Sequence, residues 1–299
     1  MARCVVSARA LPYPCGVTDW HRYLTTNARA AFGDDDDVPP FVSGQLLCRH
    51  AAAIGVPIVE VSARRAAVLA AFLRACRQAD TIAVIAVDAA PRRSSPQAPA
   101  RIMSGIVGAA RAGLHDRPLV VVARADDAPL WYAPGVAAVD AVLERLARDI
   151  DAGYGAIGLG VELAGDGAAL AALAPSLLDL DLGIELEVAA GEDAALLLAE
   201  IDDRGLAISA VRGANLHDEV GAATRVVELK DLKALAGVDA GGLRVNLDVI
   251  VAAAIARANA VDDDAVEAVA WAAISRAIAA LKADGSASLL ADALDGGAA

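Results

Sequence analysis

The sequence is short of basic residues and of long apolar runs. Lysine and arginine total 26 against 39 acidic residues, which gives a formal charge of −13. Binding to nucleic acid or to anionic lipid needs a basic face, so we expect neither partner. Although 57% of the residues are hydrophobic, no run of 18 uncharged apolar residues occurs. We therefore expect no membrane-spanning helix.

Cysteine and lysine are also scarce. The four cysteines form no C-x-x-C pair, and the segment before Arg9 and Pro12 has too little apolar length for a signal peptide. We therefore expect reduced thiols and a cytoplasmic protein. Only three lysines occur, Lys230, Lys233 and Lys282, which leaves few candidates for Schiff-base chemistry.

Short β-branched runs alternate with longer stretches rich in alanine and leucine. Seven runs are clear, and a short segment (RVVEL) is a plausible eighth; they occupy residues 56–61, 81–87, 118–123, 156–161, 183–188, 206–211, 225–229 and 243–247. Their nearly continuous apolar character is typical of parallel strands that are covered on both faces. Helical patterns between and after them occupy residues 66–77, 102–112, 136–151, 167–178, 193–203, 231–236 and 264–283. Repeated strand–helix units predict an open doubly wound sheet or a closed (β/α)8 TIM barrel, and eight runs favour the barrel.

The first 43 residues do not follow this alternation. They hold several prolines and four consecutive aspartates at 34–37, so we expect an irregular extension, or a cover over one end of a barrel formed by residues 44–299. Residues 92–99 (RRSSPQAP) are expected to form a mobile loop after the second strand.

Carboxylates lie at or just after the carboxyl end of nearly every predicted strand. They are Glu60, Asp88, Asp126, Asp127, Glu162, Glu185, Glu187 and Asp248. In a (β/α)8 enzyme the strand ends converge on the active site. Because converging carboxylates repel one another, they predict a cation: a divalent metal, a cationic substrate, or arginines such as Arg124, Arg212 and Arg244. The alternative is that several of them are solvated helix caps.

Several motifs resemble those of the class II, metal-dependent ketose-bisphosphate aldolases. Residues 45–87 are similar to the opening of that family, and the resemblance extends to about residue 288. Residues 124–127 (RADD) stand where the family has His-x-Asp-His, and residues 185–193 (ELEVAAGED) stand where it has Glu-x-Glu-Leu-Gly before Gly-Gly-Glu-Glu-Asp. Residues 215–218 (NLHD) stand in place of Asn-x-His-Gly, and residues 244–248 (RVNLD) in place of VNID. Residues 282–288 (KADGSAS) stand in place of a closing Phe-Gly-Ser segment.

The resemblance implies roles for individual residues. Asp126 matches the aspartate that positions or protonates the electrophile carbonyl, and Glu192 matches a loop glutamate implicated in proton transfer. The implied metal ligands are Asp127, Glu187 and His217, a set that suits Mg²⁺ or Mn²⁺ better than a tight Zn²⁺ site. The predicted substrate-binding residues are Asn246, Asp248, Arg212, Glu60 and Asp88.

Two features of the family are absent. The third metal histidine and its His-Gly-Gly-Ser-Gly phosphate motif have no counterpart, and Gly213 and Ala214 are poor substitutes. This argues against the usual sugar bisphosphate as substrate. Phosphate or carboxylate would then need arginines such as Arg92, Arg93, Arg212 or Arg244.

These patterns favour an aldolase-type carbon–carbon lyase that works through an enediolate on a small molecule, in a specialised biosynthetic pathway. Two alternatives stay open. In the first, the barrel uses a Schiff base, with Lys230 as the candidate, or binds an amine substrate. In the second, the chain is a non-catalytic partner, like the non-catalytic subunit relatives of tagatose-bisphosphate aldolase. Helices rich in alanine and leucine also predict a homodimer or larger homo-oligomer.

Overall fold

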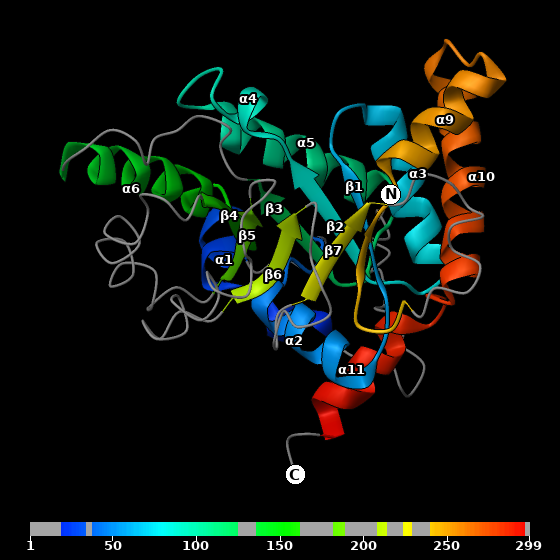
Figure 1. Ribbon diagram of the computed structural model, residues 1–299, viewed down its shortest axis with the longest axis horizontal. Helices are drawn as coiled ribbons and strands as arrows, with labels where there is room; N and C mark the ends of the chain where they lie inside the picture. Colours follow the sequence, from blue (N-terminus) through cyan, green and yellow to red (C-terminus); the bar gives the residue numbers. More distant parts are fainter. Residues whose placement is uncertain are drawn as a thin grey trace, which may run out of the picture.

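The computed structural model describes residues 19–33, 38–124, 136–161, 182–188, 208–213, 224–228 and 240–296. Eight parallel strands form a closed barrel in sequence order, which confirms the predicted (β/α)8 fold (Figure 1). They are β1 (Ile58–Ser62), β2 (Ala83–Val87), β3 (Leu119–Ala123), β4 (Ala156–Val161), β5 (Gly183–Val188), β6 (Ile208–Gly213), β7 (Thr224–Glu228) and β8 (Arg244–Asn246). The shortest strand, β8, pairs with β1 and closes the barrel.

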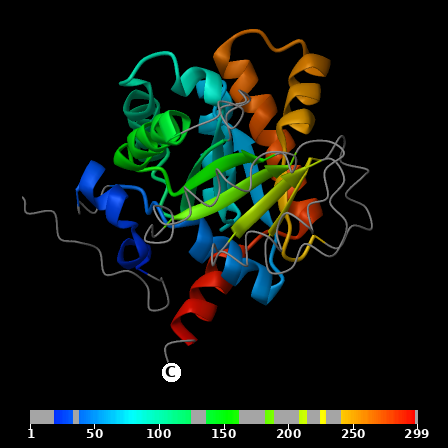
Figure 2. The same ribbon diagram turned by 60° about the vertical axis from the view of Figure 1, so that its left-hand side comes forward.

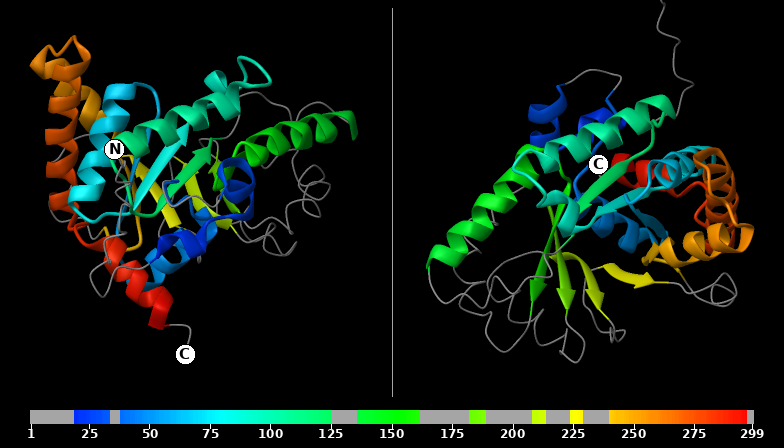
Figure 3. Two further views of the ribbon diagram at one scale, coloured as in Figure 1. Left: turned by 180° about the vertical axis from the view of Figure 1, so that it is seen from behind. Right: turned by 90° about the horizontal axis from the view of Figure 1, so that it is seen from above.

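Helices cover the described part of the outer surface. They are α1 (Thr26–Phe32), α2 (Gly44–Ile54), α3 (Ala66–Gln78), α4 (Ala89–Arg92), α5 (Ala98–Ala112), α6 (Val136–Asp151), α9 (Asp248–Ala258), α10 (Asp263–Leu281) and α11 (Ser286–Gly296). Helices α3, α9 and α10 form a layer on one side of the barrel (Figure 3). The helices predicted at 167–178, 193–203 and 231–236 lie outside the described residues.

The segment expected as a loop at 92–99 is shorter than predicted. Helix α4 ends at Arg92 and α5 begins at Ala98, with Pro99 in its first turn. Proline suits this position because its fixed φ is already helical and its missing N–H has no partner there. The proline that suggested a loop therefore marks the start of a helix.

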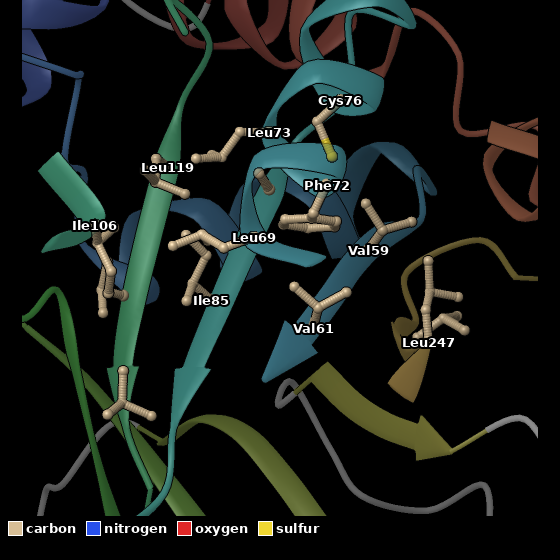
Figure 4. Close-up of a cluster of buried hydrophobic side chains, with 14 of the residues drawn as sticks. Val59, Val61, Leu69, Phe72, Leu73, Cys76, Ile85, Ile106, Leu119 and Leu247 are labelled. Atoms are coloured by element: carbon tan, nitrogen blue, oxygen red, sulfur yellow. The ribbon is translucent and has the colours of Figure 1, made fainter. Parts of the chain in front are cut away.

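Outward-facing strand residues pack against the helices. Val59 and Val61 of β1 and Ile85 of β2 are buried, and they belong to the same apolar cluster as Leu69 and Phe72 of α3 (Figure 4). Since side chains alternate between the two faces of a strand, the residues between them point into the barrel.

The amino-terminal end of the barrel is closed by helices. In Figures 1 and 2, α2 and α11 lie together below the strands. Inward-facing Ile58 shares a buried cluster with Leu47 and Cys48 of α2 and Leu290 of α11. Burial raises the pKa of the Cys48 thiol to about 11, and Cys48 and Cys76 are free cysteines. Cys4 and Cys15 lie outside the described residues.

Glycines allow α2 to approach the barrel closely. The Gly44 amide donates to the Gly155 carbonyl at 2.9 Å. A Cβ at Gly155 would lie 2.4 Å from the Val42 carbonyl oxygen, and one at Gly183 would lie 2.9 Å from the Gln45 nitrogen. This end of the barrel therefore requires glycine just before β4 and at the first residue of β5.

Part of the segment expected to be irregular has regular structure. A 3-10 turn, η1 (Trp20–Tyr23), precedes α1, and Trp20 and Phe41 are buried against the barrel. Phe41 also forms a parallel bridge with Leu119 of β3. Among the described residues, no helix has the length and apolar character needed to cross a membrane.

Candidate active site

A cavity of about 710 Å³ opens at the carboxyl ends of the strands. This is the end of a (β/α)8 barrel where active sites are built. Four arginines line it together with other polar and apolar residues; the described lining is Arg64, Arg124, Arg212, Arg225, Glu228, Asn246, Asp248, Gly213, Val226, Val227, Val249 and Ala252.

Arginines and carboxylates alternate in one continuous chain of ion pairs beside this cavity. The members, in order of contact, are Arg64, Asp88, Arg124, Glu187, Arg212, Glu60, Arg244 and Glu185. We call this set the ion-pair chain. It contains four arginines and four carboxylates, so its formal charges cancel.

The outer half of the ion-pair chain lies at the barrel mouth. Arg64 Nε donates to Asp88 at 2.8 Å, and the other Asp88 oxygen accepts from Arg124 Nη1 at 3.2 Å. Arg124 Nε donates to Glu187 Oε1 at 3.1 Å. Arg212 Nε lies 3.8 Å from the same Glu187 oxygen, which is an ion pair rather than a hydrogen bond.

The inner half lies inside the barrel. Arg212 Nη2 donates to Glu60 Oε1 at 2.6 Å, and Arg244 donates to both Glu60 and Glu185. The side chains of Glu60 and Arg244 are fully buried. Burial alone would raise the pKa of Glu60, but Arg244, Arg212 and the Asn246 hydrogen bond lower it to about 2. Glu60 is therefore ionised at neutral pH.

Arginines of this chain are one of the three predicted sources of positive charge. Glu60, Asp88, Glu185 and Glu187 are each paired with such arginines. The attraction within these pairs offsets most of the desolvation cost of bringing so many carboxylates together.

A second hydrogen-bonded group joins β8 to β1. Asn246 Nδ2 donates to Glu60 at 2.8 Å, and the Asn246 side-chain oxygen accepts from the Asp248 amide at 2.9 Å. The Ser62 amide donates to Asp248 at 2.8 Å. All five predicted substrate-binding residues thus lie at one end of the barrel, with Asn246, Asp248 and Arg212 on the cavity wall.

Only one predicted metal ligand can be placed. Asp126, Asp127, Glu192, His217 and Lys230 lie outside the described residues, whereas Glu187 is described. Across the described ranges, no group of three His, Cys, Asp or Glu residues is arranged to hold a metal ion.

Glu187 does not fit a metal ligand in this arrangement. Its Oε1 faces the guanidinium groups of Arg124 and Arg212. A divalent ion at that oxygen would have to displace or approach two positive charges.

Some site residues were missed by sequence reasoning. Ser62 and Arg64 follow Glu60 at two-residue intervals, on or just after β1. Because every second residue of a strand faces the same side, this spacing could have indicated that they lie on the same side as Glu60. Arg92 was considered as an anion-binding residue, but its buried side chain donates to Asp149 and to the Val87 carbonyl. It is not part of the cavity lining that the structure describes.

No family model matches the sequence, and no curated protein sequence is detectably similar. Similar solved structures do exist. The YdjI aldolase from Escherichia coli K12 matches with a TM-score of 0.58 and 10% identity, covering 80% of this chain and 97% of its own. Fructose-bisphosphate aldolase from Campylobacter jejuni matches with a TM-score of 0.59 and 14% identity, covering 83% of this chain and 96% of its own. The shared feature is the barrel fold.

Proposed function

We propose that the protein is an aldolase-type carbon–carbon lyase whose substrate carries an anionic group. The observation that supports it best is the arginine-lined cavity at the carboxyl ends of a barrel with the fold of known aldolases. The motif resemblance at the ends of several strands supports the same reaction class.

The charge of the cavity wall favours an anionic substrate over an amine. Its described lining contains four arginines but only two carboxylates, Glu228 and Asp248. The carboxylates that neutralise these arginines, such as Asp88 and Glu187, are not among the described lining residues. A planar guanidinium binds carboxylate or phosphate through two parallel hydrogen bonds.

Arg64 is the best placed residue to meet a permanent anion. Its side chain is 67% exposed, and its described ion-pair partner is Asp88. An exposed guanidinium at the cavity mouth can turn toward a ligand with little loss of other contacts. Either a carboxylate or a phosphate on the substrate would satisfy it.

The proposed cleavage converts a carbonyl compound with hydroxyl groups on its α- and β-carbons into an aldehyde and an enediolate. A base takes the β-hydroxyl proton, the bond between the α- and β-carbons breaks, and its electron pair forms a carbon–carbon double bond as the carbonyl oxygen becomes negatively charged. A proton then adds to the carbon that was released. We assign these proton transfers to Asp126 and Glu192, on the basis of their match to the family motifs.

A divalent ion would act on this reaction as a Lewis acid at the carbonyl oxygen. Zn²⁺, Mg²⁺ or Mn²⁺ binding through Asp127 and His217 stays a prediction, and Glu187 is held by arginines as described. Calorimetry with each ion tests it: Asp127→Asn should weaken binding if this site exists, whereas no heat from any of the three ions would contradict it.

Proton NMR in D₂O tests the proposed activity. Hydroxyketones and keto acids are followed for exchange of the hydrogens next to the carbonyl. Compounds with a β-hydroxy carbonyl group and a carboxylate, a phosphate or no anion are followed for cleavage. We expect turnover of a compound that carries an anion. Comparing the carboxylate compounds with the phosphate compounds identifies which anion is preferred. Asp126→Asn should lower kcat.

Two neighbouring arginines provide a matched control. Arg64→Gln removes a cavity arginine, and we expect it to raise KM by about 10- to 100-fold, the effect of one charged hydrogen bond. Arg65→Gln removes the same charge one residue away, where the side chain pairs with Asp263, and should leave KM unchanged.

Absence of exchange and cleavage with every compound would contradict the proposal. Borohydride trapping at Lys230 would favour a Schiff base, and no trapping would favour a non-catalytic subunit.

We also propose that the protein forms a homodimer or larger homo-oligomer, as its alanine- and leucine-rich helices suggest. Light scattering at micromolar concentration measures this directly. A mass of 30.3 kDa, that of one chain, would contradict it.

A further inference from the structure

The geometry points to Arg212 as the group that binds the reacting carbonyl oxygen of the substrate, through its Nε–H. This inference rests on the proposed function and names the residue that would stabilise the enediolate. Arg212 is the next-to-last residue of β6, it lines the cavity, and its side chain is 17% exposed.

Arg212 is held in place by a buried anion. Its Nη2 donates to Glu60 at 2.6 Å, and Glu60 is itself bonded to Arg244 and Asn246. Because Glu60 is fully buried and ionised, this anchor keeps its charge at any pH at which the protein works. The guanidinium of Arg212 is therefore oriented before any ligand arrives.

Arg212 also has an unused donor. Its buried Nε–H has no acceptor within hydrogen-bonding distance among the described residues. The nearest described anion, Glu187 Oε1, is 3.8 Å away. Leaving a buried donor unpaired costs about 1–3 kcal/mol, so such groups in native proteins call for an explanation. A ligand oxygen in the cavity would supply the missing acceptor.

The other arginines of the ion-pair chain lack this combination. Arg244 is fully buried and bonds to Glu60 and Glu185, and it is not among the described residues that line the cavity. Arg124 lines the cavity, but its Nε already donates to Glu187. Arg64 is mostly exposed, so water weakens its electrostatic interactions.

The surroundings of Arg212 favour a neutral acceptor over a permanent anion. Glu60 and Glu187 flank the guanidinium and offset its charge in the absence of ligand. A carboxylate or phosphate placed there would face both of these anions. A carbonyl oxygen carries no full charge when it binds, and it becomes anionic only when the electron pair of the breaking carbon–carbon bond reaches it. The hydrogen bond from Nε–H then strengthens as the reaction proceeds.

NMR of the arginine side chains tests this placement. In protein labelled with ¹⁵N-arginine, the Nε–H resonance of Arg212 is the one that Arg212→Lys removes. Hydroxyacetone serves as the neutral carbonyl probe, and sodium sulfate serves as the permanent anion. We expect millimolar hydroxyacetone to shift the Arg212 resonance and sulfate to shift that of Arg64 instead. No shift of Arg212 with hydroxyacetone, or a shift with sulfate only, would overturn the inference.

Kinetics give a second, separate readout. We expect Arg212→Lys to lower kcat by about 10²- to 10³-fold, the effect of losing one oxyanion donor, with KM within a few-fold of wild type. Added methylguanidine should restore part of the rate to Arg212→Ala, which a folding defect would not allow. Arg65→Gln is the control that keeps full activity.

The two proposals fail in different ways. If hydroxyacetone shifts the Arg212 resonance but no compound is exchanged or cleaved, the carbonyl site stands and the lyase proposal is wrong. If anionic substrates are cleaved but Arg212→Lys changes kcat less than the Arg64 variant does, the carbonyl assignment to Arg212 is wrong.

Discussion

At the closed end of the barrel, Ile58 of β1 and Ile82, the residue before β2, pack in one buried cluster with α2 and α11. One layer higher, β1 turns Glu60 inward, and β8 supplies Arg244 as its partner. Apolar burial at the closed end stabilises the fold by about 25 cal/mol for each Å² removed from water. A buried ion pair gives no such gain, because desolvation offsets most of its attraction. The charged layer is therefore better explained by the cavity above it than by stability.

The largest effect should come from unpairing the charged layer. Arg244→Met leaves Glu60 and Glu185 buried without their main partner. We expect a loss of about 3–5 kcal/mol in the free energy of unfolding, measured with urea at neutral pH. Ile58→Val, in the closed half of the same interior, should cost only about 0.5–1.5 kcal/mol. Equal losses in the two variants would remove the distinction between the two layers.

Acid should also destabilise the charged layer. The pKa of Glu60 is about 2 in the folded protein, below its ordinary 4.5, so the unfolded chain binds the proton more readily. Its contribution is present above pH 4.5 and is lost as the pH falls toward 2, a loss of about 3 kcal/mol. Urea unfolding at a series of pH values measures this. Glu60→Gln should be less stable at neutral pH and should show a smaller decrease over that range.

Overfilling the closed end should cost less. In Gly155→Ala the new Cβ would lie 2.4 Å from the Val42 carbonyl oxygen, so backbone must move. We expect a loss of about 1–3 kcal/mol in thermal or urea unfolding. Gly108→Ala is the matched control, because nothing lies within 4 Å of its Cβ and it is on helix α5. That variant should be more stable, by up to about 1 kcal/mol.

The smallest effect is expected outside both layers. Arg65 pairs with Asp263 at 3.2 Å on the surface, where both side chains are exposed. Arg65→Gln should change the free energy of unfolding by less than about 1 kcal/mol. A loss as large as that of Arg244→Met would mean that surface pairing, rather than the interior ion-pair chain, dominates the electrostatics of this barrel.

The barrel could be predicted from local sequence because each strand is a compact apolar run. Residues 156–161 and 183–188 match β4 and β5 at both ends. The position of Asp248, just after β8, also follows from the chain itself, whereas Glu60, expected at a strand end, is the middle residue of β1. The pairing of Arg124 with Glu187 does not, because β3 and β5 are separated by β4 and their side chains meet only across a closed barrel. Helix α11 was missed for a similar reason: its packing partner, α2, is more than 200 residues away.

The closure of one end by α2 and α11 has a kinetic consequence. The described cavity opens at the opposite end, so reactants and products that use it enter and leave through the same opening. A molecule bound deep in such a chamber blocks none of the later arrivals, but it cannot leave until they do. In an aldol addition, the component that contacts Arg212 should therefore bind first, and the order of release in cleavage should be the reverse. Product inhibition should follow this compulsory order, with only the last product released competing with the first substrate bound.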